Sequence, residues 1–378
     1  MKRYLFFSAQ FLPHMGGVEN YTYHLAKALI AGGNKVTVVT SMNVPGTKTY
    51  ENMEGIQVYR LSCLNLMDGR YPIMKFDAVY RKVNHILSEN QFDLVIINTR
   101  FYLLSLYGVL FAKKHHYRCI LIEHGTGHLA MHHPLLDVLE NLFEHTITMA
   151  EKMLCKEFYG VSEACLDWLK HFHIKGKGVI YNAIDLEYVE SELQHPACSY
   201  RELYQIPGDA IAIAFTGRLL KEKGILTLIQ AVENMNKTDR KVYLLIAGDG
   251  DEEEAVRART SEHIIALGRI TASQVIALLR ETDIFCLPSD SEGMPTSVLE
   301  AAACRNYIVT TKRGGAKELL IDDKYGMVLE NNRLETVQGA LEKAVEDSDM
   351  RRTGTELTYT RLRKLFTWER AAERVMEL

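Results

Sequence analysis

Two glutamates, Glu292 and Glu300, stand eight residues apart in the stretch SEGMPTSVLE, directly after an apolar run. Carboxylates suit sugar hydroxyls, because each can accept two directional hydrogen bonds. Between them, Gly293 permits a close backbone approach, Pro295 suits the first helical turn, and N–H groups near Thr296 could bind a phosphate. For Glu292 the alternative is ordinary complementation of a helix dipole, whereas Glu300 interrupts an apolar helix face, where an acid needs partners. The stretch is therefore a candidate binding site.

A pair of cations follows the first strand-like run in the second half of the chain. Arg218 and Lys223 lie five residues apart in TGRLLKEKG, which ends at a glycine before a helical pattern. Two fixed cations at the carboxyl end of a strand can neutralise a diphosphate and stabilise it as a leaving group. Exposed arginines and lysines are common, so a plain surface loop is the alternative.

A glycine doublet, Gly16 and Gly17, separates the first strand-like run from a helical pattern. Backbone N–H groups at such a turn can approach an anion closely. The motif is not G-x-G-x-x-G, and the second strand ends in Thr40 and Ser41 with no acid, which argues against a nicotinamide dinucleotide. A plain strand-to-helix turn is the alternative for the doublet.

Four histidines gather in the segment EHGTGHLAMHHP, namely His124, His128, His132 and His133. A metal cluster is one interpretation of these histidines, because their spacing would align three of them on one face of a helix. The glycines at 125 and 127 argue against a helix, so we expect a loop and no metal site here.

The elements that must position these residues alternate between strands and helices. Strands are expected at 3–8, 35–40, 56–61, 93–98 and 118–125, and again at 210–218, 241–250, 263–268, 283–288 and 307–311. Helices are expected at 18–31 and around 73–90, 102–115 and 134–158, and a docking helix at 367–378. A polar, irregular stretch at about 186–208 separates two such arrays. This alternation predicts an α/β protein with two Rossmann-like domains.

Composition narrows the class of protein. The 378 residues are 47% hydrophobic and 24% charged, which is typical of a globular chain and, by length, of two domains. A net charge of −4 argues against a general nucleic-acid binder. Seven scattered cysteines without a C-x-x-C pair indicate a reducing compartment. The apolar N-terminal run breaks at Gln10 and Pro13 and reads as a first strand, and no 18 apolar residues run together, so we expect a cytoplasmic protein.

The order of these motifs along the chain resembles that of a known protein family. The E-x7-E pair, GRLLKEKG, AGDGDEEE, GGVEN and YNAID resemble glycosyltransferase family 4, most strongly over residues 209–330. That resemblance implies the GT-B fold, in which two Rossmann-like domains face each other across a cleft. It implies an acceptor-binding domain at 1–186, a nucleotide-sugar-binding domain at 187–364 and a C-terminal helix at 365–378 that crosses back. It also implies a retaining enzyme that needs no metal and no cofactor, because the nucleotide sugar is a substrate.

The resemblance assigns roles to the residues already named. Arg218 and Lys223 would bind the diphosphate, Glu292 the sugar, Glu300 the ribose, and His124 the region between sugar and acceptor. The implied catalytic set is His124, Arg218, Lys223 and Glu292. The implied donor-binding set is Gly16, Gly17, Gly217, Arg218, Lys223, Ile270, Glu292, Gly293, Met294, Pro295, Thr296 and Glu300.

Donor and acceptor are inferred less directly. Thr271 stands where relatives that use guanine nucleotides can offer an acid, so a UDP-sugar is favoured over a GDP-sugar. The resemblance favours a saccharide or polyprenyl-diphosphate-linked saccharide acceptor in bacterial surface polysaccharide synthesis. Residues 102–118 read as an amphipathic helix with a basic end that could rest on the inner leaflet of the membrane; a buried helix with a basic C-terminus is the alternative. Two other functions stay open, a nucleotide-sugar epimerase of the same fold and a non-catalytic sugar-nucleotide-binding protein.

Overall fold

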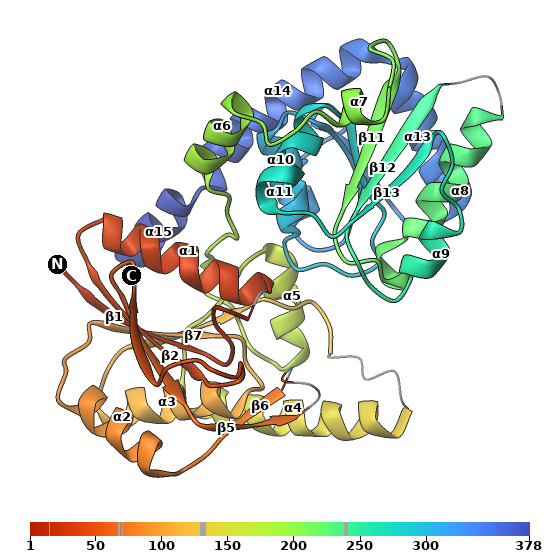
Figure 1. The fold of residues 1–378 in the computed structure, drawn as a ribbon. Coiled ribbons are helices and arrows are strands. Elements are labelled where there is room, and N and C mark those ends of the chain that lie inside the picture. Colours follow the sequence, from red (N-terminus) through yellow and green to blue (C-terminus); the bar gives the residue numbers. More distant parts are fainter. Residues whose placement is uncertain (15, 67–68, 70, 129–133, 238–240) are drawn as a thin grey trace. The chain divides into compact units, whose positions relative to one another are not determined.

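The computed structural model describes the chain except residues 15, 67–68, 70, 129–133 and 238–240. The chain divides into two compact units (Figure 1). The first comprises Met1–Asn182 together with Trp368–Leu378, and the second comprises Ala183–Thr367. The sequence placed the first boundary at 186/187, a few residues after the observed one at 182/183. It placed the second at 364/365, a few residues before the observed one at 367/368.

The described residues of the first unit form an eight-stranded sheet with the order β10-β9-β8-β7-β1-β2-β4-β3. All neighbours pair in parallel except the edge strand β3, and a separate antiparallel hairpin, β5–β6, was not expected from the sequence. Because β1 lies between β7 and β2, the strand order reverses there, which makes it a topological switch point. The strands are β1 (Arg3–Ser8), β2 (Lys35–Ser41), β3 (Tyr50–Met53), β4 (Ile56–Leu61), β5 (Cys63–Leu66), β6 (Tyr71–Met74), β7 (Leu94–Asn98), β8 (Cys119–Glu123), β9 (Phe158–Gly160) and β10 (Gly178–Val179).

The helices of this unit are α1 (Gly17–Ala31), α2 (Ala78–Ser88), α3 (Leu103–Lys114), α4 (Pro134–Leu154), α5 (Glu163–His171) and α15 (Trp368–Met376). The C-terminal helix α15 packs on α1: the Trp368 ring stacks on His24 with centroids 5.3 Å apart and meets Tyr21 edge-on at 5.5 Å. The sequence pattern predicted a docking helix but not its partner. The helix α3, for which the sequence left open a membrane contact or burial, is mostly buried, with Leu104, Val109 and Ala112 fully covered. It therefore corresponds to the alternative of a buried helix with a basic C-terminus.

The second unit contains a six-stranded parallel sheet with the order β13-β12-β11-β14-β15-β16. Its central strands are buried along their whole length, as expected when helices cover both faces. The strands are β11 (Ile211–Thr216), β12 (Val242–Ala247), β13 (Ile264–Gly268), β14 (Ile284–Leu287), β15 (Tyr307–Thr311) and β16 (Met327–Leu329). The helical segments are α6 (Leu186–Gln194), α7 (Tyr200–Leu203), the 3-10 turn Lys221–Lys223, α8 (Ile225–Asn236), α9 (Glu253–Arg257), α10 (Ala272–Arg280), α11 (Thr296–Ala303), α12 (Ala316–Leu319), α13 (Leu334–Glu346) and α14 (Ser348–Leu365).

The stretch expected to be irregular, 186–208, contains the helices α6 and α7, so that prediction was wrong. Both helices begin at a capping side chain: Asp185 accepts a hydrogen bond from the N–H of Tyr188, and Ser199 accepts one from Glu202. These N-caps are a sequence signal that identifies the helix starts.

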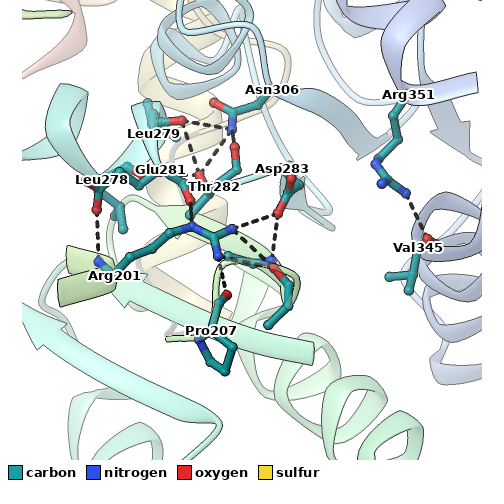
Figure 2. A network of polar contacts seen from close by, with 12 residues as sticks. Arg201, Pro207, Leu278, Leu279, Glu281, Thr282, Asp283, Asn306, Val345 and Arg351 are labelled. Atoms are coloured by element: carbon teal, nitrogen blue, oxygen red, sulfur yellow. Dashed lines mark hydrogen bonds and ion pairs between the residues drawn. The ribbon is translucent and has the colours of Figure 1, made fainter. Parts of the chain in front are cut away.

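A polar network around Arg201 fixes the amino end of the second sheet (Figure 2). The Arg201 guanidinium donates to the carbonyls of Glu281 and Pro207 at 2.8 Å and to the Asp283 carboxylate at 3.1 Å. The same Asp283 oxygen accepts the Ala212 N–H at 2.9 Å at the start of β11. Arg201 therefore stabilises the end of β11 and β14 that is opposite to their carboxyl ends.

In the described part of the chain, no helix is both long enough and apolar enough to cross a membrane. All seven cysteines are free thiols.

Candidate active site

The strand order of the second unit places two loops together. Since β11 lies between β12 and β14, the chain leaves β11 and β14 in opposite directions, and the crevice outside their carboxyl ends is where open parallel sheets bind ligands. The loop after β11 carries Arg218 and Lys223, and the loop after β14 carries Glu292. The predicted cations and the predicted acid therefore meet at one switch point.

Lys223 and Glu292 form an ion pair across these loops. The Lys223 Nζ lies 2.6 Å from Glu292 Oε1, and the two side chains are only 17% and 13% exposed. An ammonium group has three N–H donors, so this contact leaves Lys223 able to bind a second acceptor. The ion pair holds both side chains in the crevice and was not itself predicted from the sequence.

The two loops are joined through their backbones as well. The Asp290 N–H donates to the Glu222 carbonyl at 2.7 Å. Gly224 has a left-handed backbone, φ +69°, and a Cβ there would lie 2.3 Å from the Pro288 carbonyl oxygen. Only glycine satisfies both conditions, which explains why the cation motif ends in glycine.

Arg218 lies on the outer side of the same loop. Its guanidinium is exposed and, among the described residues, forms no ion pair, so it is available to an anion. Backbone hydrogen bonds to the AGDG segment fix the loop: the Gly217 N–H donates to Ala247, and the Leu219 N–H donates to Asp249 at 2.7 Å. This contact gives the AGDGDEEE motif a structural role beside the cations.

Two helices begin at this crevice without a capping side chain. They are α8, which follows Gly224, and α11, whose N-cap is Pro295. The sequence placed Pro295 inside the first turn, and the structure begins the helix one residue later, at Thr296. Uncapped helix starts direct N–H groups and a positive partial charge at a ligand, so with Lys223 and Arg218 they form a cationic site suited to a diphosphate.

A third loop, after β15, supports Gly293 and was missed from the sequence. The Gly315 N–H donates to the Gly293 carbonyl at 2.7 Å. Gly314 beside it has φ +59°. The glycine doublet between a strand and a helix was the signal, the same one that identified Gly16 and Gly17. Met294 is buried, 6% exposed, so its side chain belongs to the supporting core of the turn.

Glu300 lies two turns into α11 and is half-buried. Burial raises the pKa of its carboxyl group to about 7. An acid with that pKa in an otherwise apolar helix face is costly to ionise and gains from a hydroxyl partner. This environment fits the predicted contact with ribose hydroxyls.

Ile270 and Thr271 follow β13, two strands away from β11 in the sheet. Thr271 is the N-cap of α10 and forms a capping box with Gln274, a pattern visible in the sequence TASQ but not used there. The absence of an acid at 271, which favoured uracil over guanine, therefore has a structural explanation of its own. Ile270 is half-buried beside this cap.

In the first unit, His124 follows β8 and is hydrogen-bonded to the end of β7. Its Nε2 lies 3.2 Å from the Asn98 Oδ1, and Asn98 Nδ2 donates to Thr22 Oγ1 at 2.7 Å. This contact assigns the proton of a neutral ring to Nε2 and leaves Nδ1 as an acceptor. Burial lowers the pKa of His124 to about 3, so the ring is neutral at physiological pH.

A buried ion network sets the backbone at His124. Glu123 Oε1 accepts the N–H groups of His124 at 3.0 Å and Gly125 at 2.9 Å. The other Glu123 oxygen lies 2.5 Å from Arg100 Nε, and Arg100 also pairs with Glu144. Arg100, Glu123 and Glu144 are each 1% exposed. None of these three residues was predicted as part of a site. Arg100 lies just beyond the buried strand β7, and Glu123 is the last residue of the buried strand β8.

The first glycine turn holds a carboxylate. Glu19 is 4% exposed, its Oε1 lies 3.1 Å from His14 Nδ1, and a Cβ at Gly16 would lie 2.3 Å from its Oε2. A carboxylate therefore lies beside Gly16 at this helix start, and the contact of Gly16 and Gly17 with a phosphate stays a prediction. Of the four histidines in the first unit's loop, His132 and His133 lie outside the described residues.

Comparison with known proteins gives a consistent result. The protein-family model "Glycosyl transferases group 1" matches residues 199–360, and the family model "Glycosyltransferase Family 4" matches residues 15–188. An uncharacterised glycosyltransferase of Methanocaldococcus jannaschii is 24% identical, over 98% of this chain and 96% of its own. The GPI3 subunit of phosphatidylinositol N-acetylglucosaminyltransferase from Saccharomyces cerevisiae is 24% identical, over 97% of this chain and 80% of its own.

A solved structure supports the fold. Anabaena HepE, crystallised in complex with UDP, superposes with a TM-score of 0.74 at 16% identity, over 100% of this chain and 99% of that one. Both halves of the chain match glycosyltransferase models, and its two parallel-sheet units are those of the GT-B fold. The chain belongs to glycosyltransferase family 4.

Proposed function

We propose that this glycosyltransferase takes a sugar from a UDP-sugar and transfers it, with retention of anomeric configuration, to a lipid-linked acceptor. The observation that carries the proposal is the Lys223–Glu292 ion pair at the carboxyl ends of β11 and β14. It puts a cation for the diphosphate and an acceptor for sugar hydroxyls 2.6 Å apart, beside two uncapped helix starts.

The chemistry follows from charge. As the bond between the sugar and the diphosphate breaks, negative charge develops on the leaving phosphate, and Lys223 and Arg218 stabilise that charge. These two cations take the place that a divalent metal has in other transferases, so we propose a metal-independent transfer. The leaving phosphate accepts the proton of the incoming hydroxyl on the same face of the sugar, which retains the configuration.

His124 acts in this scheme as a neutral ring. With its pKa lowered by burial, it binds and orients a hydroxyl through Nδ1 and donates no proton to the leaving group. The sequence left both protonation states open, and the buried environment favours the neutral one.

Four features support the donor and acceptor. A protein of the same fold has been crystallised with UDP, and Thr271 offers no carboxylate to guanine. A relative is named for transfer of N-acetylglucosamine to phosphatidylinositol, a lipid acceptor. In the first unit a cavity of about 270 Å³, between β6, α2 and α3, is lined mostly by apolar side chains and has Lys114 as its cation, which suits a lipid chain with an anionic head. Bacterial surface polysaccharide synthesis on a polyprenyl diphosphate is one setting that uses such an acceptor.

The donor is tested by incubating the purified protein with UDP-, GDP- and ADP-sugars and measuring donor hydrolysis. We expect hydrolysis of a UDP-sugar, and NMR of the transfer product should show the donor's anomeric configuration. Release of an epimerised nucleotide sugar would contradict transfer, and binding without any turnover of all donors would indicate a non-catalytic protein.

Lys223→Ala is expected to weaken UDP binding by about 1.5–3 kcal/mol, because it removes a charge-assisted contact to the diphosphate together with the ion pair to Glu292. Calorimetry measures the change, with the exposed neighbour Lys221→Ala as the matched control. The double variant Lys223→Ala with Glu292→Gln separates the lost attraction from the repulsion by the Glu292 carboxylate, whose charge Lys223 no longer balances. Unchanged UDP affinity in Lys223→Ala would remove this lysine from the site.

Glu300 predicts a pH dependence of donor affinity. If its ionised form accepts the ribose hydroxyls, UDP affinity falls as pH drops below about 7, by about tenfold for each pH unit. In the free protein the raised pKa of Glu300 affects folding stability in the opposite direction. The contribution of Glu300 to the free energy of unfolding is present below its ordinary pKa and is lost as pH rises through about 7. UDP titrates as well, so Glu300→Gln is the control. The same pH profile in wild type and Glu300→Gln would contradict the assignment.

A membrane contact is better supplied by α4 than by α3. Among the α4 residues whose side chains the structure describes, the exposed ones include no carboxylate. They are Val138, Leu139, Leu142, His145, Thr146, Met149 and Met153. Such a largely apolar face suits a lipid surface. Leu142→Gln with Met149→Gln is expected to lower co-sedimentation with anionic vesicles by about tenfold. Leu203→Gln, equally exposed in α7, is the control, and equal binding by all three proteins would exclude the α4 face.

A further inference from the structure

Three histidines from separate elements of the first unit bring their Nε2 atoms together. His128 follows β8, His145 lies in α4, and His171 is the last residue of α5. The Nε2 of His171 lies 3.3 Å from that of His128 and 3.2 Å from that of His145. The ligand atoms of all three lie within 4.8 Å of one another. We propose that His128, His145 and His171 form a binding site for a divalent transition metal of the zinc class, separate from the donor site.

The distances fit tetrahedral coordination. Two nitrogen ligands on a tetrahedral Zn²⁺, with bonds of about 2.0–2.1 Å, lie about 3.3–3.4 Å apart. Hydrogen bonding alone explains the cluster poorly, because the single Nε2 of His171 faces two other Nε2 atoms and a neutral ring has one N–H at most. One bound cation satisfies all three lone pairs.

The surroundings of His128 prepare it as a ligand. Its Nδ1 donates to Glu144 Oε2 at 2.6 Å, which puts the ring proton on Nδ1 and leaves a lone pair on Nε2. A carboxylate in this position is the usual partner of a metal-bound histidine. Glu144 is itself paired with Arg100, which also pairs with Glu123, so two carboxylates face one buried guanidinium. A cation on His128 offsets the remaining negative charge.

Aromatic packing orients the other two rings. Trp168 stacks on His171 with centroids 4.8 Å apart and an interplanar angle of 6°, and Phe172 contacts His145 at 4.7 Å. The metal would tie the segment that follows His124 to α4 and α5. Its role is thus to fix a loop, and the proposed transfer reaction needs no metal at the diphosphate.

A second donor set shares one residue with the first. His128, Glu140 and Glu144 also have ligand atoms within 4.8 Å of one another. Glu144 is already engaged by Arg100 and by His128 Nδ1, which favours the three-histidine set. Variants at Glu140 and at His145 distinguish the two.

The test uses the full-length protein without a polyhistidine tag, stripped of metal with EDTA and dialysed. Titration with ZnCl2 by calorimetry, with elemental analysis of the washed protein, should give one equivalent of zinc that excess Mg²⁺ does not displace. His145→Gln and His171→Gln should each weaken zinc binding by tenfold or more, on the order of the loss seen for disturbed metal sites. Bound Co²⁺ should show the visible absorption of a tetrahedral nitrogen site.

The controls keep the outcome clear. His173→Asn removes an exposed histidine two residues from His171, at a left-handed backbone position that asparagine tolerates, and should bind zinc like wild type. Circular dichroism of the metal-free variants shows whether they remain folded. Equal zinc binding by wild type and by the His145→Gln, His171→Gln double variant would overturn the proposal. Loss in Glu140→Gln with retention in His145→Gln would overturn the three-histidine set.

Discussion

Replacing Glu292 with glutamine is expected to lower kcat for sugar transfer by about 100-fold or more, the size of effect found when a preorganised polar contact at a reacting centre is removed. Glutamine keeps the shape of the side chain but loses the charge that pairs with Lys223. Affinity for UDP should stay equal or become tighter, because Lys223 is then free to bind the diphosphate alone. The variant should therefore separate turnover from nucleotide binding.

The measurements are steady-state kinetics with the preferred donor, UDP calorimetry and thermal unfolding. Asp290→Asn is a matched control, since it removes an exposed carboxylate from the same loop, where Asp290 contacts Asn332. We expect that control to turn over like wild type and the thermal unfolding of both variants to be unchanged. Normal turnover in Glu292→Gln would remove Glu292 from the reacting centre, whereas joint loss of turnover and UDP binding would show that it acts in donor binding.

The meeting of Arg218, Lys223 and Glu292 at one edge could be predicted because strands in a parallel sheet expose their carboxyl ends at one edge; their binding of the donor stays a prediction. Arg218, Lys223 and Glu292 each follow an apolar run, so their type and position were visible in the sequence. Their pairing was not, because the residues of the ion pair are 69 positions apart. Only the placement of β14 next to β11 brings them together, and several strand orders are compatible with the same alternation of elements.

Contacts that depend on helix packing were less visible. His145 and His171 lie on α4 and α5, 26 residues apart, and no spacing rule links them to His128. The four-histidine segment drew attention to His128, but it contains neither His145 nor His171, the proposed partners of His128. The helices α6 and α7 were missed because polar composition was read as irregular structure, although Asp185 and Ser199 marked both starts.

The buried ion network of the first unit predicts a large effect on stability. Arg100→Met should destabilise this unit by about 3–5 kcal/mol, because Glu123 and Glu144 would remain in the core without a cation. Burial already raises the pKa of Glu123 even with Arg100 present. In the variant its pKa should rise further, so the folded state would bind more protons and lose stability as pH increases. The deficit should therefore be smaller at acid pH than at pH 8.

Both tryptophans, Trp168 and Trp368, lie in the first unit, so tryptophan fluorescence during urea unfolding reports on that unit. Arg118→Met is the matched control: Arg118 makes the same kind of contact with Glu157, at 2.6 Å, but its side chain is 41% exposed. Solvent screening makes such a pair worth about 1 kcal/mol at most. Equal midpoints for the two variants would show that Arg100 is not required to hold Glu123, and the positioning of His124 would then depend on the backbone alone. A large loss confined to Arg100→Met, narrowing at low pH, would establish the buried pair as the support of the His124 loop.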